Sequence, residues 1–417
     1  MKSHSAHSGK RSYARITYFA AVFALLAFVV VAAAACSGSA NGQTSTTATG
    51  GPATTAAGGG AVTTGGTVTT AAGDTLFPAM DSSSKWGYIN KTGAWVIKPA
   101  WAYATRFSEG LARVATGDSK SHLWGFIDTT GKEITPIQYA TAGDFHEGFA
   151  QVQTDAKGKW GYVDKTGKLV IPEQFADAGD FSGGLAIAVG DSGDLRGFID
   201  TTGAFVIKPL YAGAGPFSED LAAVSLKKGD QWGFIDKTGT TAIAPQFDAV
   251  SDFKSGLALV GVMPAGAEKK QANLRLGYVD KAGAWVAQPT FLNGHDFSDG
   301  LAQVSIDDKG SSHIGFIDTT GKVVLEFKDW AQVGDFSEGF VSVVKNGMVG
   351  YADKSGKVVL PPKYDVGQAF HGGLALVVAT GAAEQEMGYI DTSGKIVYWS
   401  NPEGQHWSGG TTTTTAK

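Results

Sequence analysis

Residues 86–114 read WGYINKTGAWVIKPAWAYATRFSEGLARV, and variants of this stretch return along most of the chain. The glycine of its W-G pair recurs at positions 125, 161, 197, 233, 277, 315, 350 and 388, and the F-S-E-G-L-A segment occurs in eight variants between Phe107 and Phe370. Self-similarity at a period of about 35–45 residues indicates a repeat architecture. The sequence therefore predicts eight complete units and a ninth that stops after its first half.

Each unit reads as three short antiparallel strands. The first, W-G-[YF]-[IV]-D, is aromatic and β-branched, and D-[KT]-[TAS]-G after it is a turn that Asp caps and in which Gly takes the left-handed conformation. A V-I segment follows and usually ends at Pro, which cannot donate to a ladder. The third strand is G-L-A-x-V. No sustained helical periodicity occurs after residue 35, so we expect an all-β body.

The units are expected to depend on their neighbours, because an isolated hairpin is marginal in water. The Phe of F-S-E-G is the best candidate for the core between them. The prediction is a tandem repeat of about nine three-stranded antiparallel units, stacked as an open solenoid or superhelix. The alternative is a closed β-propeller, for which 36-residue units are short, since a four-stranded blade usually takes about 40–45 residues.

The N-terminal segment, residues 1–36, has the form of a lipoprotein-type signal peptide. A basic stretch is followed by the uncharged apolar run of residues 16–35 and then by Cys36, the only cysteine of the chain. Ala33-Ala34-Ala35-Cys36 resembles a lipobox, which predicts lipidation at Cys36, although Ala33 stands where Leu is usual. An uncleaved membrane anchor and an ordinary cleaved signal remain alternatives. All three place the rest of the chain outside the cytoplasm.

The remaining boundaries follow from composition. Residues 37–75 are rich in Thr, Gly, Ser and Ala and bury too little apolar surface to fold, so we expect a disordered tether. Residues 76–408 form the repeat domain and residues 409–417 a flexible tail. Formal net charge is −5 and becomes more negative without the basic N-terminal stretch, which argues against nucleic acid or an anionic lipid surface as partner.

The segments KWGYIN-KTG, VIKP and RFSEGLARV resemble the WG (KWG) repeat of bacterial proteins, and the resemblance covers residues 85–398. It implies a repeat scaffold, similar in layout to hairpin repeats that bind bacterial cell-wall glycans. The leading Trp departs from the pattern in five units, where Arg196, Leu276, Ile314, Val349 and Met387 replace it.

Residue types that carry chemistry are scarce or repeat at turn positions. No H-x-x-x-H or H-E-x-x-H spacing occurs, and we expect no metal site and no cofactor. The recurring Asp of the D-x-x-G turn and Glu of F-S-E-G (Glu109, Glu147, Glu219, Glu338) are interpreted as turn residues, and so are His146 and His371, which stand in the Ser position of F-S-E-G. The sequence gives no support for an enzyme.

Two irregular features mark candidate binding residues. An insertion at residues 263–277 brings the cations Lys269, Lys270 and Arg275, and insertions in repeat arrays map to loops. Tryptophans outside the repeated pattern, Trp95, Trp101, Trp285 and Trp330, could stack on sugars or fill interface pockets, with ordinary packing as the other interpretation. We expect a non-catalytic, membrane-anchored lipoprotein of the bacterial cell envelope that binds a protein or cell-wall glycan. An enzyme acting on wall polymers and a passive spacer are the alternatives.

Overall fold

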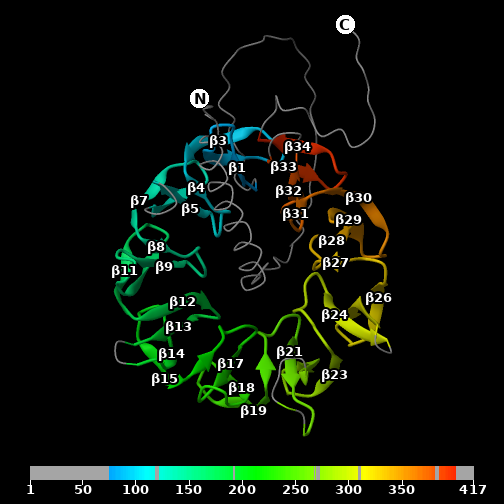
Figure 1. Cartoon of the computed structure of the whole chain (residues 1–417). Coiled ribbons are helices and arrows are strands. Elements are labelled where there is room, and N and C mark those ends of the chain that lie inside the picture. The colour runs from blue at the N-terminus through cyan, green and yellow to red at the C-terminus, as the bar shows by residue number, and fades with distance from the viewer. Residues whose placement is uncertain are drawn as a thin grey trace, which may run out of the picture. The chain divides into compact units, whose positions relative to one another are not determined.

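The computed structural model describes residues 75–117, 122–190, 193–266, 268, 273–308, 311–380 and 385–400. Contacts divide the chain into Met1–Val68 and Thr69–Lys417, and all described residues belong to the second unit. In this unit nine antiparallel sheets follow one another around a ring, and the first lies beside the ninth (Figure 1). It is a nine-bladed β-propeller. The all-β class and the nine modules are confirmed, whereas the open solenoid of three-stranded units is wrong.

Seven blades have four strands, and blades 1 and 7 have three. The innermost strands border the centre of the ring and are mostly two residues long: β4 (Tyr103–Ala104), β8 (Thr141–Ala142), β12 (Asp177–Ser182), β16 (Gly213–Ala214), β20 (Ala249–Val250), β27 (Gln332–Val333) and β31 (Val366–Gly367). The second strands are β1 (Phe77–Met80), β5 (Leu111–Thr116), β9 (Phe149–Gln153), β13 (Leu185–Val189), β17 (Leu221–Ser225), β21 (Leu257–Val262), β24 (Leu301–Asp308), β28 (Phe340–Lys345) and β32 (Leu374–Thr380).

The third strands carry the W-G segments or their variants: β2 (Trp86–Ile89), β6 (Leu123–Asp128), β10 (Trp160–Asp164), β14 (Arg196–Ile199), β18 (Trp232–Asp236), β22 (Arg275–Asp280), β25 (Ser311–Asp318), β29 (Met348–Asp353) and β33 (Gln385–Asp391). The outer strands are β3 (Trp95–Trp101), β7 (Glu133–Tyr139), β11 (Leu169–Phe175), β15 (Phe205–Tyr211), β19 (Thr241–Phe247), β23 (Trp285–Phe291), β26 (Val323–Phe327), β30 (Val358–Tyr364) and β34 (Ile396–Trp399). Blades 1 to 9 are β1–β3, β4–β7, β8–β11, β12–β15, β16–β19, β20–β23, β24–β26, β27–β30 and β31–β34.

The short innermost strand explains why the solenoid prediction is wrong. Tyr103 and Ala104 pair with Ala115 and Val114, which adds a fourth strand at a cost of only two residues. A 36-residue unit can therefore supply a four-stranded blade. Each blade combines the F-S-E-G-L-A half of one sequence unit with the W-G half of the next, so blade and sequence unit are offset.

This offset lets the N-terminal strand close the ring. Blade 1 has a W-G half but no F-S-E-G half before it, and β1 pairs with β2 in the vacant position. Phe77 of β1 faces Tyr389 of blade 9 with ring centroids 5.5 Å apart. The Tyr389 hydroxyl donates to the Pro78 carbonyl at 2.9 Å, and the Tyr398 hydroxyl donates to that of Met80 at 2.7 Å.

The core lies at the seams between blades. One buried cluster, for example, joins Tyr162 and Phe175 of blade 3 to Phe181 and Ile199 of blade 4. Every seam contains an aromatic pair with centroids 4.6–5.5 Å apart. The pairs are Tyr88–Phe107, Phe126–Phe145, Tyr162–Phe181, Phe198–Phe217, Phe234–Phe253, Tyr278–Phe297, Phe316–Phe336, Tyr351–Phe370 and Tyr389–Phe77. The expected core role of the F-S-E-G phenylalanine is confirmed, and Phe77 takes that role in the closing seam.

Glycine is required at two repeated positions. A Cβ on Gly233, in the W-G pair of blade 5, would lie 2.5 Å from the Ile243 carbonyl oxygen, because the outer strand crosses close to the third. Gly131, in a D-x-x-G turn, has φ +85°, which only glycine adopts without strain. A glycine at each of these positions therefore allows the same backbone path in successive blades.

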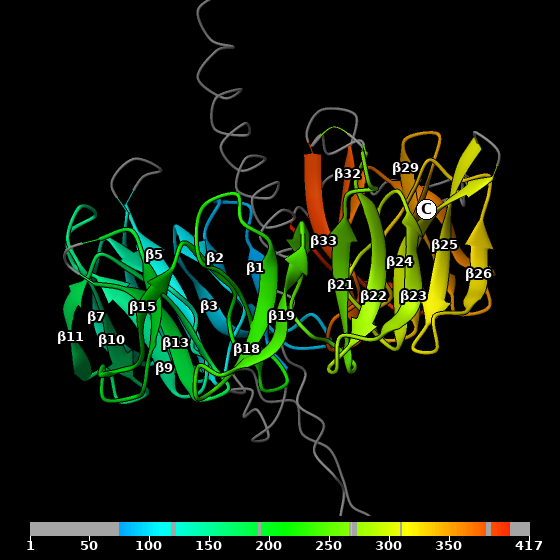
Figure 2. The same cartoon turned by 90° about the horizontal axis from the view of Figure 1, so that it is seen from below.

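The alternation of strand direction gives the ring two different faces. The S-E-G turns and the D-x-x-G turns lie together on one face, which we call the turn face. The loops that join second and third strands lie on the opposite face, the hairpin face; Figure 2 shows the β21–β22 and β24–β25 hairpins along that edge. None of the described residues forms a helix long and apolar enough to span a bilayer.

Candidate functional site

The repeated aspartates of the turn face hold their own turns. Asp164 Oδ1 accepts hydrogen bonds from the Thr166 amide at 2.9 Å, the Thr166 hydroxyl at 2.6 Å and the Lys168 amide at 3.1 Å. The Thr166 hydroxyl, together with these amides, holds the pKa of Asp164 below its ordinary value. Asn90 makes the same contacts in blade 1 through its amide oxygen. The interpretation of these residues as turn residues is confirmed.

The glutamates of F-S-E-G join successive blades. The carboxylate of Glu147, in blade 3, accepts from the amides of Gly183 and Gly184 in blade 4 at 2.8 and 2.7 Å. Glu109, Glu219 and Glu338 make the corresponding contact to the next blade. Each sits at φ between +50° and +52°. Because the carboxylates bind backbone amides, the turn face uses its repeated acids for structure.

A second acidic series precedes the buried phenylalanine and lies near the innermost strands. Asp144 pairs with Arg113 Nε of the preceding blade at 2.7 Å, and Asp335 Oδ1 lies 2.9 Å from His295 Nδ1. The hydrogen bond that the His295 ring donates to Asp335 raises the pKa of His295. Within the described ranges, no three such side chains are placed to hold a metal ion. These charges therefore act as pairs across seams.

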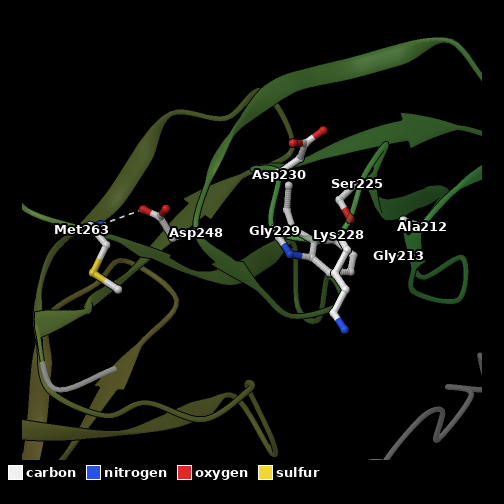
Figure 3. Close-up of a pocket in the computed structure, with 9 residues that line it drawn as sticks. Ala212, Gly213, Ser225, Lys228, Gly229, Asp230, Asp248 and Met263 are labelled. Atoms are coloured by element: carbon white, nitrogen blue, oxygen red, sulfur yellow. Dashed lines mark hydrogen bonds between the residues drawn. The ribbon is translucent and has the colours of Figure 1, made fainter. Parts of the chain in front are cut away.

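The hairpin face differs from blade to blade, unlike the turn face. The β28–β29 hairpin turns at Asn346 and Gly347, whereas residues 263–274 join β21 to β22. A pocket of about 310 Å³ opens on this face between blades 5 and 6. Its lining is Ala212, Gly213, Ser225, Lys228, Gly229, Asp230, Trp232, Asp248 and Met263 (Figure 3).

The pocket is built by the register of blade 5. Gly213 pairs with Ser225, and Ser225 lies beside Trp232 on the next strand. A Cβ on Gly213 would lie 2.4 Å from Cη2 of Trp232 and 2.7 Å from the Ser225 hydroxyl, so the indole edge occupies the space that glycine leaves. Asp248 Oδ2 accepts from the Met263 amide at 2.8 Å, which fixes the start of the long connection at the rim (Figure 3).

The sequence-predicted aromatic residues lie in separate places. Trp95 of blade 1 packs edge-on against Tyr398 at 5.4 Å, and Trp101 is in the core of the same blade. Trp285 packs against Phe247, 6.1 Å between centroids, and Lys345 Nζ lies 5.6 Å from the Trp330 ring. The four tryptophans thus do not form one binding surface. Their contacts agree with the other interpretation, ordinary packing.

The predicted cations are only partly described. Arg275 is half-buried on β22 and donates to the Leu274 carbonyl at 3.0 Å. Lys269, Lys270 and the lipidation candidate Cys36 lie outside the described residues. The insertion does contribute to the pocket through its first residue, Met263. The sequence analysis does not identify four other residues of the pocket: Gly213, Ser225, Lys228 and Asp230. The signal that could have indicated them is a glycine, Gly213, in the blade that keeps Trp232 of the W-G pair.

The sequence profile described as "WG containing repeat" matches residues 86–118, 124–157, 160–189, 197–229, 232–262, 277–309, 314–348 and 350–380, more than half of the chain. The chain is a member of the WG-repeat family. No curated protein matches the sequence of this WG-repeat protein.

Solved structures share its fold at low identity. A eukaryotic initiation factor is 13% identical, with a TM-score of 0.52 over 79% of this chain and 96% of that one. Dipeptidyl peptidase 4 of Porphyromonas gingivalis is 9% identical, with a TM-score of 0.45 over 81% of this chain and 61% of the peptidase. At 13% identity the likeness to the initiation factor concerns the fold alone.

Proposed function

We propose that this WG-repeat protein is a non-catalytic binding scaffold that holds a protein or a glycan on its hairpin face. The repeated polar groups of the turn face are used inside the ring, as the contacts of Asp164 and Glu147 illustrate. On the hairpin face the loops differ, and the pocket there carries exposed side chains such as Lys228 and Asp230. Specific recognition needs surface that differs from blade to blade, so the pocket is the observation that supports this proposal.

The absence of an enzymatic role is part of the same proposal. An enzyme acting on wall polymers would need carboxylates available to a substrate. Glu109 and Glu147, two of the recurring glutamates, each bind backbone amides of the next blade instead. We therefore favour binding over catalysis.

Location is proposed from the sequence. The basic and apolar segments before Cys36 support export and anchoring through a lipid on that cysteine, outside the cytoplasm in a bacterial envelope. Labelling of cells with radioactive palmitate tests the anchor: the proposal expects label in the unaltered chain and none after Cys36→Ala. Label in neither would indicate an uncleaved anchor or a released protein.

The binding role is tested with arrays of envelope proteins and glycans probed with the full chain. A charge reversal on the hairpin face, Lys228→Glu, is expected to reduce retention of the ligand. The matched control is Lys91→Glu, an exposed lysine in a turn-face loop, which should leave retention unchanged. Retention of nothing by the unaltered chain would favour a passive spacer, and equal loss in both variants would argue against the hairpin face.

A further inference from the structure

We propose that the pocket of blade 5 binds one pyranose ring of a carbohydrate; this rests on the proposed function and names the ligand class of its binding face. Ser225 is the strongest indication. Its residue is only 5% exposed, yet its hydroxyl has no hydrogen-bond partner among the residues that the structure describes, and it faces the pocket (Figure 3). Because this hydroxyl opens to the pocket and makes no bond to the protein, a sugar hydroxyl can donate to it or accept from it.

The other blades that keep the tryptophan show what is special in blade 5. In blade 2, Tyr103 occupies the position of Gly213 and lies 6.3 Å from Trp124, and Ala115 stands in place of Ser225. In blade 3 the corresponding residue to Ser225 is Gln153, whose amide donates to the Gly158 carbonyl. Blade 5 therefore combines a half-buried indole, a missing inner side chain and a hydroxyl that opens to the pocket.

The lining matches the chemistry of a sugar ring. The Trp232 indole and Met263 give apolar contact area on which the C–H face of a pyranose can stack. Around them are donors (the Lys228 ammonium and the indole N–H), an acceptor (the Asp230 carboxylate) and the Ser225 hydroxyl, which can do both. Sugar hydroxyls both donate and accept hydrogen bonds, so this mixed set of donors and acceptors can pair with them.

Charge and size argue against other small ligands. The lining holds one ammonium, Lys228, and two carboxylates, Asp230 and Asp248. Lys228 and Asp230 extend in opposite directions from one loop, and Asp248 accepts from the Met263 amide, so the charges do not converge on one point (Figure 3). A phosphate would need several converging donors, and a polycation several converging carboxylates. The volume of about 310 Å³ is at the lower end of the range for small-molecule sites, roughly 300–1,000 Å³. One ring-sized neutral unit fits best.

The test measures binding of the full chain by calorimetry and saturation-transfer NMR. The probes are glucose, galactose, mannose and N-acetylglucosamine, and linear oligosaccharides of glucose and of N-acetylglucosamine. We expect at least one sugar to bind and Ser225→Ala and Trp232→Phe each to weaken that binding about fivefold or more. Ala115 in the Ser225 position of blade 2 and Leu276 in the Trp232 position of blade 6 show that the ring accepts smaller side chains there. Thermal unfolding of each variant checks folding.

Matched controls come from blade 3, whose Trp160 and Lys157 do not line this pocket. Trp160→Phe and Lys157→Ala should leave sugar binding unchanged, while Lys228→Ala should weaken it. The inference is wrong if no sugar binds, if the blade 5 variants bind as the unaltered chain does, or if inorganic phosphate binds instead. A protein ligand retained on the hairpin face in the absence of sugar binding would overturn this inference and leave the proposed function standing.

Discussion

Phe77 and Tyr389 pack against each other with ring centroids 5.5 Å apart, although nearly the whole repeat array separates them in sequence. Their arrangement matches that of Phe217 and Phe198 at an interior seam, where the centroids are 4.8 Å apart. The acceptors differ: Tyr389 donates to the Pro78 carbonyl on β1, whereas Tyr162 donates to the Gly179 carbonyl, two residues before the buried Phe181. The closing seam therefore keeps the aromatic pair of the interior seams, while the N-terminal strand β1 supplies both its ring and its hydrogen-bond acceptor.

The closing seam should be as important for stability as an interior one. Phe77 is 2% exposed and Phe217 is 1% exposed, so truncation of either leaves a similar cavity. Phe77→Ala and Phe217→Ala are each expected to lower the free energy of unfolding by about 3–5 kcal/mol, measured by urea unfolding. If Phe77→Ala lowered the free energy of unfolding by much less than Phe217→Ala does, Phe77 would lie at a frayed end of the chain and not in a closed seam.

The seam glutamates should stabilise the ring despite their backbone conformation. Glu147→Gly relieves a left-handed φ of +51° but removes both bonds to Gly183 and Gly184. Because hydrogen bonds to a charged group outweigh the strain at an exposed turn, we expect a net loss of about 1–2 kcal/mol in urea unfolding. Ser255→Gly is the control, since Ser255 has φ +55° without a seam carboxylate, and it should be neutral or slightly stabilising. The same sign in both variants would contradict the role of Glu147.

The turn aspartates should make the ring sensitive to acid. The Thr166 and Thr202 hydroxyls hold the pKa values of Asp164 and Asp200 below the ordinary value, and the amides of the same turns add to this. A folded pKa below the unfolded value of about 3.9 gives stability that is present above that pH and lost as pH falls through the folded pKa. Urea midpoints should therefore fall below about pH 4.

Asn90 provides the control for that pH dependence, because it makes the same turn without a titrating group. Asp164→Asn together with Asp200→Asn should leave the midpoint at pH 7 nearly unchanged and flatten its decline below pH 4. An equally steep decline in this variant would assign acid sensitivity to other groups.

Asp252 should act in the opposite direction. Burial, with the nearby Asp296 carboxylate, raises the pKa of Asp252 to about 6. Since the folded value exceeds the unfolded one, stability falls as pH rises from about 4 to 6, and ionised Asp252 destabilises the fold at pH 7. Asp252→Asn should add about 1–3 kcal/mol at pH 7 and almost nothing at pH 4.

The equivalent residue of blade 3 gives the matched control for Asp252. Asp144 pairs with Arg113 at 2.7 Å, so Asp144→Asn should destabilise the ring at pH 7. Urea unfolding at both pH values measures the two variants. A loss of stability at pH 7 in Asp252→Asn would show that Asp252 has a stabilising partner.

Much of the module was predictable because its determinants are local. The capping of a turn by Asp164, the left-handed Gly131 and the need for Gly233 after Trp232 all follow from nearby residues. The core role of Phe217 also follows, because one residue type recurs at one position in every unit. Nine modules could therefore be counted before their arrangement was known.

Closure and the pocket depend on relations that periodicity does not show. Tyr103–Ala104 is too short to show an alternating pattern, so the sequence predicts three strands per unit and does not reveal the fourth. Phe77 precedes the first W-G pair and belongs to no repeated motif, although a leftover half unit at the C-terminus requires a partner. Gly213 and Ser225 meet only through strand register, and the pocket depends on the side chain that Gly213 lacks beside Trp232 of the same blade.

The closed ring is tested most directly by a disulfide across the last seam. A Cβ on Gly372 would lie 3.4 Å from Thr75 Cβ, close to the separation of about 3.5–4.5 Å found in disulfides. In a Cys36→Ser background, Thr75→Cys with Gly372→Cys should form an intramolecular disulfide in the native monomer, seen by non-reducing electrophoresis and intact mass. Thr75→Cys with Gly183→Cys, the equivalent turn of blade 4, should not. Absence of the first cross-link, or its formation only between molecules, would contradict the nine-bladed ring.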